Sequence, residues 1–152
     1  MAVLGSASAR LSTTFEWLTE LYIEFDCGDW GFLKDLLEFS PRLQVLNMSK
    51  SGWCTWGHDH VSKTCWEEPT DIPGCLLHSL ARVSFYGFEG LKRELKLLKY
   101  ILKHGAVMKT ILIGCSKEEK TVQKVEKLRR VPKASPSCEI ELSSGARGAT
   151  WN

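Results

Sequence analysis

The sequence holds 152 residues, a length typical of one domain with a buried core. Its 43% hydrophobic and 25% charged residues exclude a disordered chain, and no apolar run approaches the roughly 20 residues that a membrane-spanning helix needs.

The net charge of +2 is unevenly distributed along the chain. Residues 1–76 contain 5 Lys/Arg and 11 Asp/Glu, so this half is acidic, whereas residues 77–152 contain 15 Lys/Arg and 7 Asp/Glu, so that half is basic. We interpret the basic half as lysines that solvate helix faces. The alternative, a nucleic-acid-binding module with a basic face, is disfavoured because no aromatic residues alternate with the basic ones.

The N-terminus has neither the basic region nor the apolar region of a secretory signal peptide. We therefore expect an intracellular protein, cytoplasmic or nuclear, whose six cysteines are reduced. Residues 1–14 and 144–152 are small and polar, and both segments are expected to be disordered.

A spacing of the form L-x-x-L-x-L recurs four times along the chain, at steps of 25, 37 and 28 residues. A weaker fifth occurrence has Ser137 at its first position, followed by Ile140 and Leu142. A repeat of this form with a period in the twenties is typical of leucine-rich repeats, in which each unit contributes one strand. The four clear occurrences are Leu18, Leu21 and Ile23; Leu43, Leu46 and Met48; Leu80, Val83 and Phe85; and Met108, Ile111 and Ile113.

Helices are predicted between the strands. In residues 91–104, leucines recur at three- and four-residue spacing and form an apolar face, while four lysines and Arg93 form the opposite face. Gly105 follows this helix at the position where a left-handed C-cap would need a glycine. The other two helices and their expected N-caps are residues 30–39 with Asp29 and residues 117–131 with Ser116.

These elements predict an α/β fold. No unit can bury its apolar face alone, so the units are expected to stack into a short solenoid. Right-handed crossovers place the helices on one side of a mostly parallel sheet. The fold class is therefore a short leucine-rich-repeat-like solenoid.

Residues 51–69 interrupt the repeat and are expected to form an irregular loop rich in Trp, Cys and His. Tetrahedral zinc is conceivable there, but the spacing of the four candidate ligands matches neither common paired arrangement, so an incidental Cys and His content is favoured. Those candidates are Cys54, His58, His60 and Cys65. Three tryptophans could contact a partner if exposed, although burial in the core is the favoured interpretation; they are Trp53, Trp56 and Trp66.

The sequence offers no constellation of residues for catalysis. It has no Gly-rich phosphate loop, no G-x-S-x-G and no H-E-x-x-H. We interpret four cysteines beside apolar residues as buried thiols and not as nucleophiles; they are Cys27, Cys75, Cys115 and Cys138. We expect neither enzymatic activity nor a cofactor.

The second half of the chain carries several motifs that occur together. They are Trp66-Glu-Glu-Pro, Ile72-Pro-Gly-Cys-Leu-Leu-His-Ser-Leu80, Phe88-Glu-Gly90, the lysine- and leucine-rich run 94–105 and the closing segment Cys138-Glu-Ile-Glu-Leu142. This combination resembles the FBD domain of plant F-box/FBD/LRR-repeat proteins. The upstream segments 15–21 and 36–46 resemble the last leucine-rich repeats of the same proteins.

The resemblance implies leucine-rich-repeat-like units over residues 15–50 and an FBD domain over 70–143. It also implies a protein–protein interaction module similar to the substrate-recognition part of an SCF-type ubiquitin ligase; the alternative is a structural or non-functional fragment of such a protein. The 14 residues before the first repeat are too few for an F-box, so we expect no binding to a Skp-type adaptor. The expected core consists of Leu18, Leu21, Ile23, Leu43, Leu46, Leu80, Val83, Phe85, Leu95, Leu98, Leu102, Ile111, Ile113, Ile140 and Leu142.

Overall fold

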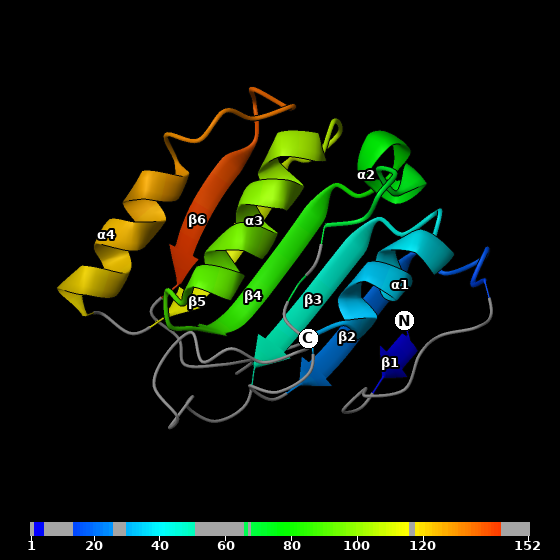
Figure 1. Cartoon of the computed structure of the whole chain (residues 1–152), viewed down its shortest axis with the longest axis horizontal. Helices are drawn as coiled ribbons and strands as arrows, with labels where there is room; N and C mark the ends of the chain where they lie inside the picture. The colour runs from blue at the N-terminus through cyan, green and yellow to red at the C-terminus, as the bar shows by residue number, and fades with distance from the viewer. Residues whose placement is uncertain are drawn as a thin grey trace.

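A computed structural model describes the backbone of residues 2–4 and residues 14–25, 30–50, 66, 68–115 and 118–143. In this part of the chain the strands form one sheet, in which every neighbouring pair is parallel and the spatial order follows the chain (Figure 1). The strands are β1 (Ala2–Leu4), β2 (Glu20–Phe25), β3 (Val45–Lys50), β4 (Arg82–Phe88), β5 (Thr110–Cys115) and β6 (Glu139–Ser143).

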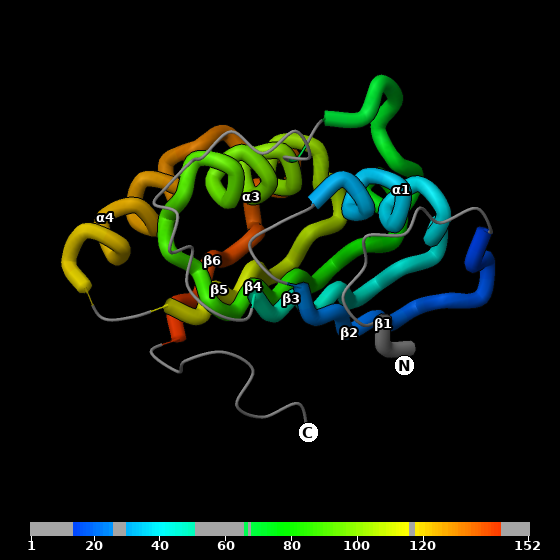
Figure 2. The backbone as a smooth tube through the Cα atoms, turned by 60° about the horizontal axis from the view of Figure 1, so that its bottom comes forward, coloured from blue at the N-terminus to red at the C-terminus, as the bar shows by residue number. Residues whose placement is uncertain are grey.

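Helices cover one face of this sheet. They are α1 (Phe32–Phe39), the short α2 (Gly74–His78), α3 (Lys92–His104) and α4 (Glu119–Leu128). Figure 2 shows α1 and α3 on the same side of the strands, while the opposite side of the sheet has no helix among the described residues. The α/β solenoid with a parallel sheet and helices on one side is thus confirmed.

The repeat spacing sets the register of the sheet. The second apolar position of each repeat pairs with its equivalents across the strands, in the order Leu21, Leu46, Val83, Ile111 and Ile140. The third position gives a parallel row of Ile23, Met48, Phe85, Ile113 and Leu142. Side chains two residues apart share one face of a strand, so both rows point toward the helices.

The turns before the strands repeat as well. The carbonyl oxygen of Thr19 accepts the N–H groups of Gln44 (2.7 Å) and Val45 (3.0 Å). The carbonyl oxygen of Gln44 in turn accepts those of Ala81 (2.9 Å) and Arg82 (3.1 Å). The same pair of backbone hydrogen bonds therefore joins neighbouring repeats that are 25 residues apart and neighbouring repeats that are 37 residues apart. The longer connection between β3 and β4 does not change how the repeats pair.

All but two of the predicted core residues are buried. Leu95 is half-buried at the margin of the apolar face of α3. The prediction was wrong for Leu142, which is 38% exposed. This side chain points to the helix side of β6, but β6 is the edge strand and α4 packs over β5, so it is only partly covered. At the start of this repeat Ser137 is exposed and the neighbouring Cys138 is buried.

Several local predictions need correction. Gly105 has φ −75° and not a left-handed conformation; it ends α3 by donating its N–H to the carbonyl oxygen of Ile101 at 2.8 Å. Gly31 and not Asp29 is the N-cap residue of α1, and Glu118 is that of α4. Asp29 and Ser116 themselves lie outside the described residues.

The ends of the chain were expected to be disordered. Within residues 1–14, Ala2–Leu4 nevertheless forms β1, because its backbone continues the parallel ladder beyond β2. Residues 144–152 lie outside the described part, as does most of 51–69. No helix in the described part of the chain is long and apolar enough to cross a membrane.

Candidate interaction surface and buried charge cluster

The turn between β4 and α3 contains a cluster of buried charges. The Nζ atom of Lys50, at the end of β3, forms ion pairs with the carboxylates of Glu89 and Glu94. The side chains of Lys50 and Glu94 are both fully buried, whereas that of Glu89 is 13% exposed. Lys50 follows Met48 by two residues, so the alternation of the strand points it to the helix side.

Two glycines shape this turn. Gly87 has φ +85° at the place where the register between β4 and β5 shifts, and a Cβ there would meet the backbone carbonyl oxygen of Lys50. Gly90 has φ +79°, and its carbonyl oxygen accepts a hydrogen bond from Lys124 Nζ at 2.9 Å. These left-handed conformations cost little only in glycine. They direct Glu89 toward Lys50 and lead the chain into α3.

Glu94 also caps the helix that it belongs to. Its Oε1 atom accepts the backbone N–H groups of Glu89 (2.9 Å) and Leu91 (3.0 Å). Burial raises the pKa of the Glu94 carboxyl, while the charge of Lys50 and these N–H donors oppose the rise. The carboxyl group thus joins β3, the β4–α3 turn and the N-terminus of α3.

Aromatic side chains extend the cluster toward the first repeat. The guanidinium carbon of Arg93 lies 5.0 Å from the centroid of the Trp30 ring, a cation–π distance. Trp30 packs against Phe25 and Phe85, with ring centroids 5.2 and 6.1 Å away. Arg93 is therefore only 8% exposed, and the prediction that it belongs to the solvated face of its helix was wrong, because Trp30 covers it.

The described cysteines do not have the properties of nucleophiles. The thiol of Cys75 donates to the carbonyl oxygen of Leu37 at 3.5 Å, and burial raises its pKa to about 12. Burial also raises the pKa values of Cys115 and Cys138. A thiol reacts as its thiolate, so burial and a raised pKa lower the reactivity of these groups near neutral pH. Cys27 lies outside the described residues.

Most residues of the predicted Trp-, Cys- and His-rich loop lie outside the described part of the chain, including all four candidate zinc ligands and Trp53 and Trp56. Elsewhere, the described residues include no group of three metal-ligating side chains. Trp66 is 5% exposed, and its ring centroid lies 5.4 Å from that of Tyr100. Trp66 is thus a core residue and not an exposed anchor.

The face of the sheet opposite the helices was not singled out by the sequence. We call it the open sheet face and define it as the three registered rows of side chains on that side of β2 to β6. The rows are Glu20, Val45, Arg82, Thr110 and Glu139; Tyr22, Asn47, Ser84, Leu112 and Glu141; and Glu24, Ser49, Tyr86, Gly114 and Ser143. The signal was present, because these residues alternate with the apolar positions of each repeat.

The open sheet face has a distinct distribution of charge. Its four glutamates lie on β2 and β6, the first and last strands of the face as defined, and all four are exposed. Between them, β3, β4 and β5 carry one charged residue, Arg82, together with Val45, Leu112, Tyr86, Gly114 and small polar residues, of which Asn47 and Ser49 are buried. The face therefore combines a mostly neutral centre with acidic margins.

Comparison with known proteins agrees with this architecture. The model of the FBD family matches residues 67–113, which run from the segment before α2 through α3 into β5. Residues 67–113 of this chain belong to the FBD family. A probable FBD-associated F-box protein of Arabidopsis thaliana is 34% identical over 115 residues, which cover 74% of this chain and 32% of that protein. An F-box/FBD/LRR-repeat protein of the same plant is 33% identical over 138 residues, which cover 86% of this chain and 30% of that protein.

The whole chain thus spans about a third of the length of these two relatives. Both names include F-box and FBD, and the second also includes leucine-rich repeats. No solved structure matches the chain. The resemblance derived from the motifs of the sequence is confirmed.

Proposed function

We propose that this chain is a protein–protein interaction module that holds a target protein, as the substrate-recognition part of an F-box/FBD/LRR-type subunit of an SCF-type ubiquitin ligase. The observation that supports the proposal is the open sheet face, where five strands arrange side chains in three registered rows without a helix above them in the described part. These residues are exposed or half-buried except Asn47, Ser49 and Gly114, which are buried. Backbone pairing fixes the positions of these side chains, so little conformational freedom is lost when a partner binds.

The family supports the same role. The relatives' names combine an F-box with the modules found here. In the proposed arrangement the F-box part of such a protein attaches to the ligase, and the repeats with the FBD domain hold the target. We assign no contact with a Skp-type adaptor to any described residue.

Substitutions on the open sheet face test the proposal. Ser84→Arg and Leu112→Arg, made separately, place a long charged side chain in the middle row and should abolish capture of the partners that the unchanged chain retains from plant extract. Gln123→Arg adds the same charge on an exposed position of α4 and should leave capture unchanged. Equal capture by all four proteins would contradict the proposal.

A functional assay follows from the same variants. The chain, fused behind the F-box of a relative, should promote ubiquitylation of a captured target in the presence of the ligase components. Ser84→Arg should remove this activity, and Gln123→Arg should not. Ubiquitylation that persists with Ser84→Arg would show that the target binds elsewhere.

A further inference from the structure

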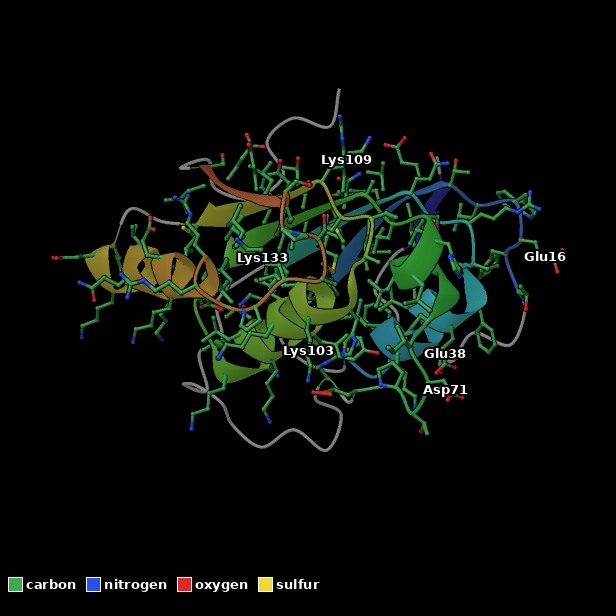
Figure 3. All side chains as sticks on the ribbon, turned by 90° about the horizontal axis from the view of Figure 1, so that it is seen from above. Glu16, Glu38, Asp71, Lys103, Lys109 and Lys133 are labelled. Carbon is green, nitrogen blue, oxygen red and sulfur yellow. The ribbon has the colours of Figure 1, made fainter. Side chains whose placement is uncertain are left out.

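The exposed side of α3 carries an uninterrupted row of positive charge. Lys92, Lys96, Lys99 and Lys103 are all exposed and follow each other at spacings of four, three and four residues. These spacings place them on one side of a helix, over about 16 Å of its length. We call this row the lysine stripe. Figure 3 shows Lys103 on the helix side of the molecule, opposite Lys109 on the sheet side.

Three lysines of the stripe, Lys96, Lys99 and Lys103, have no carboxylate of their own helix beside them among the described residues. The acidic residue of α3 is Glu94, which is fully buried and paired with Lys50. No ion pair of Lys96, Lys99 or Lys103 is found within the described residues. Lysines three and four residues apart repel each other on a helix.

The neighbouring helix shows the usual pattern. The exposed residues of α4 mix signs, with Glu119 and Glu126 among its lysines, and Glu126 pairs with Arg129 at 3.5 Å just beyond the end of the helix. Acidic side chains also occur on the other flank of α3, where Glu38 and Asp71 are exposed (Figure 3). The unbalanced positive charge is therefore about one helix wide.

We propose that the lysine stripe is a docking site for a short acidic segment of a partner protein. The inference rests on the proposed function, because it supplies a second contact with a protein partner on the side opposite the open sheet face. Carboxylates of a helix or of about five extended residues would match the length of the stripe.

The width of the stripe argues for a polypeptide. A nucleic acid would extend over the acidic residues on both flanks, and the exposed side chains of α3 include neither arginine nor an aromatic ring for stacking. A single acidic segment fits between those flanks. Exposed ion pairs are screened by salt, so binding should weaken as ionic strength rises.

Fluorescence anisotropy with a labelled twelve-residue peptide of Glu and Asp tests the proposal. The unchanged chain should bind it at low salt, and the variant Lys96→Glu/Lys99→Glu/Lys103→Glu should lose affinity roughly tenfold or more. The control Lys120→Glu/Lys127→Glu on α4 should stay within about twofold of the unchanged chain. Because all five lysines are exposed, both variants should fold, which circular dichroism checks.

Three outcomes would overturn the proposal. They are equal peptide affinity in the unchanged chain and the α3 variant, equal losses in the α3 and α4 variants, and tighter binding of a twelve-nucleotide single-stranded RNA or of phosphatidylserine vesicles than of the peptide. The proposed function is tested separately by Ser84→Arg. If that variant loses its target while the α3 variant binds the target and the peptide normally, only the present inference fails.

Discussion

Replacing Lys50 with methionine would leave the Glu94 carboxylate buried without its cation. Both side chains are fully buried, so solvent cannot take over the role of the lysine. Removing one partner of a buried ion pair costs about 3–5 kcal/mol, because the remaining charge is uncompensated. At about 2–4 °C per kcal/mol for a domain of this size, the melting temperature should fall by roughly 10 °C.

The free energy of unfolding that is lost in Lys50→Met should depend on pH. Burial already raises the pKa of Glu94, and loss of Lys50 removes the charge that opposes this rise. A carboxyl group whose folded pKa lies above its unfolded pKa binds more protons in the folded state, so stability falls as pH rises from the unfolded value through the folded one. The destabilisation by Lys50→Met should therefore be smaller at pH 5 than at pH 8.

Urea unfolding, followed by circular dichroism at both pH values, measures this effect. The double variant Lys50→Met/Glu94→Gln should recover part of the lost stability, since an amide oxygen can still accept the two backbone N–H groups at that site. Lys127→Met on the exposed side of α4 is the matched control and should change little. A cost below about 1 kcal/mol, the scale of an exposed pair, or a cost independent of pH would refute the reasoning.

Four further predictions each concern a single position. Gly87→Ala should destabilise the chain by about 1–3 kcal/mol, because φ is positive and the Cβ would meet the Lys50 carbonyl oxygen. Gly74→Ala, which meets nothing within 4 Å, should be neutral or slightly stabilising, and thermal melting of both variants measures the difference. Cys75 should resist iodoacetamide at pH 8 in the folded chain and react after unfolding in urea, as mass spectrometry would show; rapid labelling of the folded chain would contradict its burial. Leu142→Glu should cost less than about 0.5 kcal/mol in urea unfolding, since its side chain is already 38% exposed.

The repeat array was predictable because two periods overlap in the sequence. Apolar residues two apart mark the inward side of a strand, and apolar residues three and four apart mark a helix face. These local rules identified Leu21, Val83 and Ile111 as equivalent positions, and the register pairs them across the sheet. They could not show that the last repeat is only partly covered, which is why Leu142 was assigned to the core.

The charge cluster was harder to predict because its members lie far apart in the chain. Lys50 and Glu94 are separated by 44 residues; Lys50 belongs to no recognised motif, and the motif 94–105 that begins with Glu94 does not reveal its partner. One signal was available: Lys50 occupies an inward position of its strand, where a charge requires a buried partner. The burial of Arg93 depends on Trp30 in the same way, since only the folded chain brings the two side chains together.

The ion pair between Lys50 and Glu94 also bears on what constitutes a folding unit here. Glu94 lies inside the segment 67–113 that the FBD family model matches, whereas Lys50 comes from the strand before it. A fragment limited to residues 67–113 would therefore carry a carboxylate placed for burial and lack its counter-ion. The matched segment thus ends within an ion-paired structure, and we expect a fragment of residues 67–113 to be less stable than the same segment joined to the preceding repeat.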